Sequence, residues 1–170
     1  KKPYISPHLA NDTFFNEDAG RRAVAELLIT EGIVDCISAH QAGVAALSPA
    51  TTTFRVGDHP RLVKLTEKAQ KVVICNDSEA NGAGEKGAIA TARVLFDACR
   101  NVRIGKLERP TGTEKIDVND LVRTQGAPAL KAVISWARTL PRFLIDSLSD
   151  GMPAADQAGA LAPILPMLAQ

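Results

Sequence analysis

Four carboxylates follow two short apolar runs and are the side chains best placed for chemistry. Glu31 and Asp35 come directly after the first run, and Asp77 and Glu79 come after the second. Apolar runs of this length, bounded by turn residues, are typical of buried parallel strands. In an open α/β sheet, ligands bind beyond the carboxyl ends of the strands. We therefore expect the four carboxylates to gather at that edge of a sheet.

Carboxylates gathered in one crevice need something to neutralise them. A pair about 4 Å apart repels by about 4 kcal/mol at an effective dielectric constant near 20. Protons could relieve this by raising the pKa of one member, but oxygen ligands without histidine or cysteine favour Mg²⁺ or Mn²⁺. A divalent ion held by carboxylates is common in phosphoryl and nucleotidyl transfer. The alternative is that some of these acids, above all Asp35 and Glu79, cap helices or stay solvated.

The composition indicates one α/β domain with a small appendage. The chain has 170 residues, of which 45% are hydrophobic and 4% aromatic, and this length allows one full core. Its net charge of +1 gives no overall attraction for nucleic acid or an anionic membrane, so any nucleic-acid contact must depend on local patches. The first residue is lysine, not methionine, which is compatible with a fragment of a longer protein.

The cysteines and the hydropathy pattern indicate a cytoplasmic protein without membrane contact. Cys36, Cys75 and Cys99 are far apart and have no histidine at ligand spacing. This pattern predicts neither a zinc site nor a disulfide framework and fits a reducing compartment. No apolar run approaches the roughly 20 residues of a membrane span.

Strand and helix patterns alternate along the first part of the chain. Apolar runs predict strands at residues 26–30, 44–47, 71–75 and 101–107. Helical spacing between and after these runs predicts helices at residues 33–42, 61–70 and 85–100. This alternation predicts a four-stranded, mainly parallel sheet flanked by helices.

The last part of the chain, from residue 109 onward, no longer alternates between strand and helix patterns. Residues 109–122 have the composition of a loop and carry a second acidic cluster around Asp117. Helical spacing follows at residues 127–138, at 142–148 and from 154 onward, and Trp136 is expected in the core. The predicted organisation is a lead-in segment, an α/β domain and a helical appendage, at residues 1–24, 25–125 and 126–170.

A glycine-rich stretch offers a competing interpretation. Gly82 to Gly87 spell GxGxxG before a predicted helix, and Glu108 lies where a ribose-binding acid would be expected in a dinucleotide site. Six residues, two of them acidic, separate the strand from the first glycine, whereas pyrophosphate binding needs the glycine at the strand end and no acids nearby. We interpret the glycines as a close-approach turn into the helix and keep a dinucleotide site as a distant alternative.

These segments together resemble a known family. The EG-x-x-D arrangement that begins at Glu31, a hydroxyl-rich loop and the D-x-acid pair at Asp77 are similar to the Toprim domain of bacterial-type primases, topoisomerases, small nucleases and recombination-mediator proteins. Five segments match primases in order, and they cover nearly the whole chain: KKPYISPH with the two following phenylalanines, LLITEGIVDCISAHQAGVAAL, the D-x-acid stretch, IDVNDLVRTQGAPALKAVISWA, and FLIDSL with the tail.

The resemblance implies a Toprim, Rossmann-like fold and roles for five acids. Glu31 matches the proposed general acid/base of nucleotidyl transfer. Asp77 and Glu79 match the metal-binding acids, Asp35 matches the extra acid of the first box, and Asp117 matches the first acid of the later box. The family usually has aspartate in place of Glu79, and the longer glutamate arm could shift the ion.

The resemblance also implies a function. It predicts the catalytic core of a primase-like enzyme that makes RNA primers on single-stranded DNA from nucleoside triphosphates, with Mg²⁺ or Mn²⁺ as cofactor and a replicative helicase as a further partner. Candidate phosphate-binding residues are Lys86, Arg103, Lys106 and Lys115.

Primases usually also have a basic template-binding lobe and a zinc-binding module, and neither is visible in this sequence. We therefore expect the chain to be weakly active alone. The alternatives that stay open are a Toprim nuclease, which would cut nucleic acid with the same ions, and a non-catalytic Toprim binding module.

Overall fold

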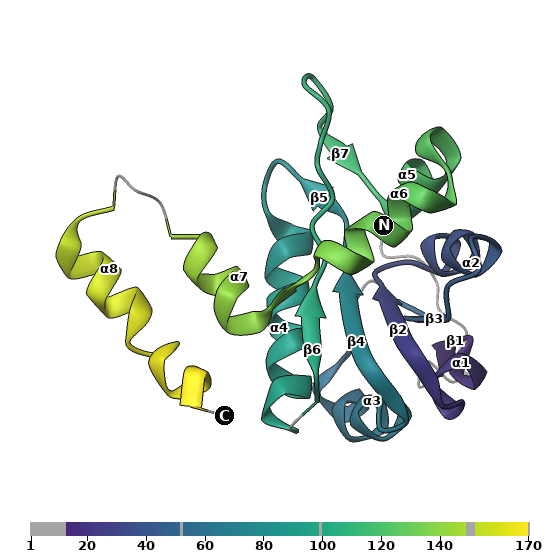
Figure 1. Ribbon diagram of the computed structural model, residues 1–170, viewed down its shortest axis with the longest axis horizontal. Coiled ribbons are helices and arrows are strands. Elements are labelled where there is room, and N and C mark those ends of the chain that lie inside the picture. The colour runs from purple at the N-terminus through teal and green to yellow at the C-terminus, as the bar shows by residue number, and fades with distance from the viewer. Residues whose placement is uncertain (1–12, 52, 99, 149–151, 170) are drawn as a thin grey trace, which may run out of the picture.

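A six-stranded sheet forms the centre of the molecule. The computed structural model describes residues 13–51, 53–98, 100–148 and 152–169. The strand order is β1-β3-β2-β4-β6-β8, in which the four central strands are parallel and the two edge strands antiparallel. The strands are β1 (Phe14–Phe15), β2 (Val24–Thr30), β3 (Ala46–Pro49), β4 (Ala69–Cys75), β6 (Val102–Ile104) and β8 (Arg138–Thr139). In Figure 1 the arrowheads of β2, β4 and β6 point toward the same end of the molecule.

This architecture confirms the predicted α/β fold with a mainly parallel sheet flanked by helices. The two antiparallel edge strands were not predicted. Each of them is only two residues long, so neither can show the alternation of side chains by which a strand is recognised. They exist because a neighbouring strand offers backbone partners, which a local pattern does not reveal.

Both faces of the sheet are covered, which explains why the central strands are apolar along their length. Along β2, Leu27 and Ile29 face one hydrophobic core, and Leu28 between them faces a second. The helices on the first face are α1 (Glu17–Arg21), α3 (His59–Leu65), α4 (Ala83–Asp97) and α7 (Leu140–Asp146). The helices on the second face are α2 (Ile33–Gln41), α5 (Val118–Gln125) and α6 (Ala127–Trp136).

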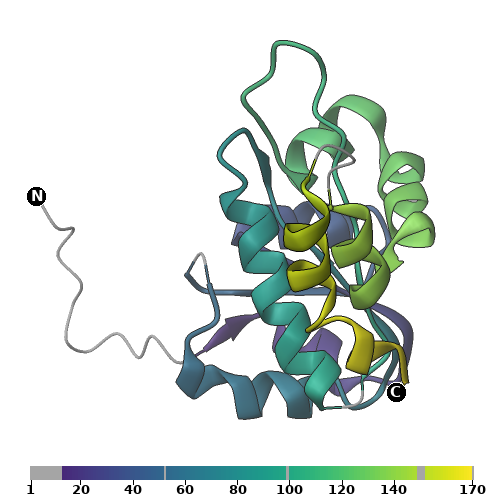
Figure 2. The ribbon, with the colours of Figure 1, turned by 90° about the vertical axis from the view of Figure 1, so that its left-hand side faces the viewer.

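The C-terminal part of the described chain lies outside these layers. Helix α8 (Ala154–Leu161) and the 3₁₀ segment η2 (Leu165–Ala169) follow α7. Figures 1 and 2 show α8 on the side of α7 that faces away from the sheet. Ile164, between α8 and η2, is only 4% exposed and belongs to the core of the first face. Leu161 and Met167 also pack against this core, so three apolar side chains attach the tail to the domain.

Trp136 is not in the core, so this prediction was wrong. Its side chain is 82% exposed, whereas Ile134 and Leu140 are buried. The prediction assumed one helix from residue 127 to 138, but α6 ends at Trp136 and the chain then extends into β8. Trp136 and Leu140 therefore do not lie on one helix, and their spacing does not place them on the same face.

A small two-stranded ribbon projects beyond the carboxyl edge of the sheet. Its strands, β5 (Ser78–Glu79) and β7 (Lys115–Ile116), are antiparallel, and Figure 1 shows them above the arrowheads of the central strands. The segment 109–122, predicted as a loop, thus contains β7 and the beginning of α5. The ribbon brings the residues after β4 next to the residues before α5.

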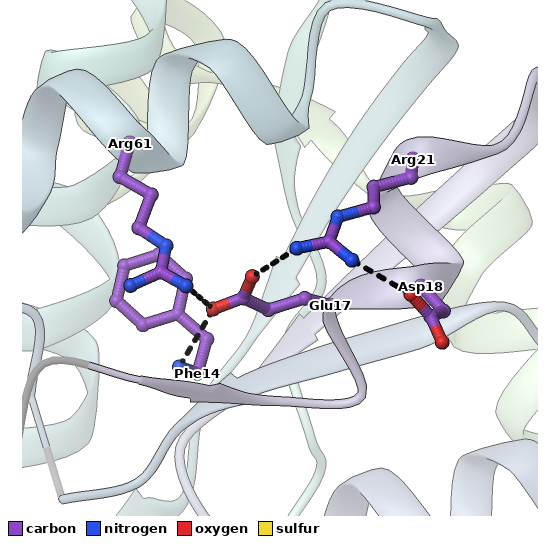
Figure 3. A network of polar contacts seen from close by, with 5 residues as sticks. All are labelled: Phe14, Glu17, Asp18, Arg21 and Arg61. Carbon is purple, nitrogen blue, oxygen red and sulfur yellow. Dashed lines mark hydrogen bonds and ion pairs between the residues drawn. The ribbon is translucent and has the colours of Figure 1, made fainter.

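One carboxylate, that of Glu17, holds the N-terminal elements together. Glu17 accepts hydrogen bonds from the Phe14 backbone N–H and from Arg21, both at 3.1 Å, and pairs with Arg61 at 2.5 Å. Arg21 also donates to Asp18 at 3.0 Å, and the Arg61 guanidinium lies 5.4 Å from the centre of the Phe14 ring. Figure 3 shows how these side chains connect β1, α1 and α3. The 3₁₀ segment η1 (Val56–Asp58) leads into α3.

Two further predictions concern cysteines and membranes. Cys36 and Cys75 are free and buried, as expected for a chain without a disulfide framework, while Cys99 lies outside the described residues. Among the helices that the structure describes, none combines the length and the apolar character needed to cross a bilayer.

Candidate metal centre

Three aspartates from three different elements meet at the carboxyl edge of the sheet. Asp35 lies in the first turn of α2, Asp77 follows β4, and Asp117 immediately precedes α5. Each offers one carboxylate oxygen, and these three oxygens all lie within 4.8 Å of one another. The structure therefore brings together three of the four residues predicted as metal ligands.

Asp35 is held between the beginnings of two helices. It is only 7% exposed, and its Oδ1 accepts a hydrogen bond of 2.9 Å from the backbone N–H of Asn119 in α5. The Asn119 side chain is itself fixed, because its Oδ1 accepts a 2.9 Å hydrogen bond from Ser38 of α2. A Cβ at Gly32 would lie 2.8 Å from Asp35 Oδ2, so a larger residue there would displace the Asp35 carboxylate.

Asp77 is positioned by the beginning of α4. A Cβ added at Gly84 would lie 2.0 Å from the Asp77 carbonyl oxygen, which no side chain could tolerate. Gly82, at the N-cap, has a φ of +69°, in the left-handed region that favours glycine. The glycines thus form the close-approach turn that we predicted. The absence of a side chain at Gly84 makes room for the Asp77 backbone, so the dinucleotide interpretation loses its main support.

Asp117 has a structural role as well as a place in the cluster. Its Oδ1 accepts a 2.7 Å hydrogen bond from the backbone N–H of Asp120 and so caps α5. This bond fixes the side chain at the point where β7 turns into the helix. Because the cap uses Oδ1, the second oxygen of the same carboxylate remains for a ligand.

Glu31 lies at the same edge, beside Asp77. Its Oε2 accepts a long hydrogen bond of 3.4 Å from the Asp77 backbone N–H. The residue also lines a cavity of about 100 Å³ together with His59, Asn76 and Thr91. Glu31 is therefore next to the three aspartates without belonging to their cluster.

Glu79 is not a member of the three-aspartate cluster and is paired with a lysine. It is opposite Lys115 in the β5–β7 ribbon, with 3.5 Å between Oε1 and the Lys115 Nζ. The same Nζ lies 2.5 Å from Oδ2 of Asp77. Lys115, predicted as a phosphate-binding residue, thus contacts the acids directly.

Burial and mutual repulsion shift the ionisation of the acids. Burial raises the pKa of Asp35 to about 6, and the nearby charges of Asp117 and Asp77 add to the effect. Burial also raises the pKa of Asp77 although Lys115 opposes the shift. The pKa of Glu31 is also raised, mainly by burial and to a smaller extent by the negative charge of Asp77. A positive charge at this edge would relieve all three shifts.

The donor set fits a hard divalent cation. Three carboxylates without histidine or cysteine are the ligands that Mg²⁺ and Mn²⁺ prefer. Oxygens on opposite sides of Mg²⁺ are about 4.2 Å apart, so ligand atoms within 4.8 Å of one another need only small movements to surround one ion. Asp35, Asp77 and Asp117 could therefore hold such an ion.

The other predicted phosphate-binding cations lie in different surroundings. Lys86, in the first turn of α4, and Lys106, after β6, are exposed. Lys106 also lines a small hollow of about 30 Å³ that it shares with Asp77. Arg103 on β6 is half-buried and donates a 3.4 Å hydrogen bond to the Ala137 carbonyl, so it joins the sheet to the end of α6.

Two features of the site were not predicted from the sequence. The Ser38–Asn119 hydrogen bond joins residues 81 positions apart, and no local signal marks such a pair. The position of Lys115 on the acids follows from the β5–β7 pairing, which involves two strands of only two residues each.

A family model described as Toprim-like matches residues 28–122, which is more than half of the chain. The chain belongs to the Toprim-like family. The matched segment includes Glu31 and the three clustered aspartates, so the site lies inside the Toprim-like region.

Relatives of this Toprim-like chain are DNA primases. The DNA primase of Clostridium acetobutylicum is 27% identical over 135 residues, which is 79% of this chain and 21% of that protein. The DNA primase of Listeria innocua is 30% identical over 141 residues, or 80% of this chain and 21% of that protein. The chain thus spans about a fifth of the length of the curated relatives that it matches.

Solved primase structures share the fold. A DnaG primase catalytic domain bound to single-stranded DNA has a TM-score of 0.68 and 25% identity, covering 98% of this chain and 54% of that one. The RNA polymerase domain of Mycobacterium tuberculosis primase DnaG has a TM-score of 0.68 and 18% identity, covering 99% of this chain and 55% of that one. The Toprim fold predicted from the sequence is thereby confirmed.

Proposed function

We propose that this Toprim-like chain is the catalytic core of a primase-like enzyme that makes RNA primers on single-stranded DNA. The observation that carries the proposal is the convergence of Asp35, Asp77 and Asp117 within 4.8 Å of one another. Glu31 lies beside Asp77 at the same edge. The primase relatives and the DNA-bound structural neighbour favour nucleotidyl transfer over other uses of such a site.

The three aspartates would hold Mg²⁺ or Mn²⁺. When bound, such an ion neutralises charge on the triphosphate and its leaving pyrophosphate. The chain's own contribution is to keep the three carboxylates in place through the α2, α4 and α5 contacts. Glu79 would act from the β5–β7 ribbon beside the site and not as a ligand of the same ion.

Glu31 would transfer the proton. A general base works best when its pKa is close to the working pH, and burial and the charge of Asp77 both raise the pKa of Glu31. Its carboxylate could accept the proton of the attacking hydroxyl. The exposed Lys86 and Lys106 would bind phosphate oxygens near the same edge.

An assay with labelled ribonucleotides tests this proposal. The protein is incubated with single-stranded DNA, the four ribonucleoside triphosphates and Mn²⁺, and the products are separated by size. DNA-dependent formation of short RNA is the expected result, at a low rate for the 170-residue chain alone. Cleaved DNA would support the nuclease alternative. The absence of both RNA synthesis and DNA cleavage would support a binding module.

Matched variants assign the chemistry to the site. Asp77→Asn and Glu31→Gln remove one charge each with little change of shape and should each abolish metal-dependent product formation. Asp156→Asn is the control, because it makes the same change at an exposed position on α8. Full activity in both site variants would contradict the assignment.

A further inference from the structure

Lys115 and a divalent cation would need the same carboxylate. The Lys115 Nζ lies 2.5 Å from Asp77 Oδ2, and Asp77 is also a member of the aspartate cluster. The side chain of Asp77 is only 9% exposed, so it has little room to contact two cations at the same time. A positive charge of the protein therefore lies against a ligand of the candidate metal centre.

The ribbon fixes where the lysine backbone lies, but not where its ammonium must stay. Lys115 is directly opposite Glu79 in the β5–β7 pair, and this pairing directs its arm toward the acids. Its side chain is 48% exposed, and it has four flexible carbons. The ammonium can thus leave Asp77 for solvent or for a phosphate group while the backbone stays in place.

The lysine also has a stabilising role in the cluster. Asp77 and Glu79 both contact its ammonium, at 2.5 and 3.5 Å. Without it, Asp77 would be a buried carboxylate near two other aspartates with no cation beside it, and an unpaired buried charge is costly. Removal of Lys115 should therefore affect protein stability and cation affinity in opposite directions.

We propose that Lys115 is an internal competitor of the divalent cation, which stabilises the cation-free protein and weakens cation binding at the aspartate cluster. This inference rests on the proposed function, because it takes the three aspartates to be the cation site. Its consequence is that the affinity of the site rises when the ammonium moves to another anion, such as the triphosphate of a nucleotide. Cation binding and nucleotide binding would then favour each other.

Measurement of Mn²⁺ affinity and of stability in Lys115→Met tests the inference. Changes in the immediate surroundings of a metal site alter affinity by about 10- to 100-fold, and we expect Lys115→Met to bind Mn²⁺ at least about tenfold more tightly than the unaltered chain. Titration calorimetry or the electron paramagnetic resonance signal of free Mn²⁺ gives the affinity. In the presence of a chelator the same variant should unfold at a lower temperature.

Three further variants make the result specific. Lys115→Gln removes the charge but keeps a hydrogen-bond donor, so it should also bind Mn²⁺ more tightly and is the measurement to use if the methionine variant does not fold. Lys115→Arg keeps the charge and should resemble the unaltered chain. Lys68→Met makes the same change in net charge at an exposed position between α3 and β4 and should alter neither quantity.

The outcomes separate this inference from the proposed function. Equal or weaker Mn²⁺ binding by Lys115→Met and Lys115→Gln, with clear binding by the unaltered chain, would overturn the inference and leave the cation site intact. If the unaltered chain and both variants all fail to bind Mn²⁺ at millimolar concentration, the proposed function itself fails, and the inference with it.

Discussion

Replacement of Asp35 by asparagine should stabilise the cation-free protein at neutral and alkaline pH. Burial and two neighbouring aspartates raise the pKa of Asp35 from 3.8 to about 6. The folded protein thus holds this proton more tightly than the unfolded chain does. The protonated Asp35 carboxyl therefore contributes to the free energy of unfolding. This contribution is fully present below about pH 4 and is lost as the pH rises through about 6. Asparagine has the same shape and can still accept the Asn119 hydrogen bond, but it carries no charge.

The size of the Asp35 pKa shift determines how much the substitution changes the free energy of unfolding. A difference of about 2 pKa units corresponds to about 3 kcal/mol, at 1.36 kcal/mol per unit. We therefore expect Asp35→Asn to raise the free energy of unfolding by up to about 3 kcal/mol at pH 8, and by about half of that at pH 5. Urea unfolding with a chelator present, repeated at several pH values, measures this difference.

Mn²⁺ should reduce or reverse the difference in stability between Asp35→Asn and the unaltered chain. A ligand at 100 times its dissociation constant adds about 2.7 kcal/mol to the folded state. The unaltered chain should gain this amount, and Asp35→Asn should gain less because one ligand is lost. Asp156→Asn makes the same change at an exposed position on α8 and is the control, which should leave the free energy of unfolding nearly unchanged. If Asp35→Asn is less stable than the unaltered chain at pH 8 without cation, the reasoning about burial and repulsion is refuted.

Other predictions test the packing around the site. Gly84→Ala would place a Cβ 2.0 Å from the Asp77 carbonyl oxygen. It should therefore lower the free energy of unfolding by about 3 kcal/mol, as measured by urea unfolding. It should also weaken Mn²⁺ binding, as measured by calorimetry. Leu95→Ala, at a fully buried position, should cost about 2–5 kcal/mol in the same unfolding assay. Trp136→Ala, at an 82% exposed position, should change stability by less than about 0.5 kcal/mol; a larger loss would show that the indole is packed. Glu17→Gln should cost on the order of 2 kcal/mol, because the carboxylate accepts three contacts; an unchanged melting temperature would contradict this.

Local patterns in the sequence were enough to predict the layers of the fold. Continuous apolar runs indicated parallel strands covered on both faces, as the opposite directions of Leu27 and Leu28 confirm. The acids after those runs were expected at one edge, because the carboxyl ends of parallel strands meet there. The separation of the glycines from the strand end indicated a packing turn, and the contact between Gly84 and Asp77 bears this out.

Only the tertiary structure decided which acids meet and what neutralises them. Asp117 lies 40 positions after Asp77 and reaches the same point because α5 packs beside α2. Glu79, only two residues from Asp77, is not in the cluster, although it shares the Lys115 ammonium with Asp77. The physical reason is that a strand or helix pattern depends on neighbours within a few residues, whereas the partner of a charged side chain depends on which distant segments pair. The two-residue strands β5 and β7 carry no pattern of their own, yet their pairing places an ammonium on the buried Asp77.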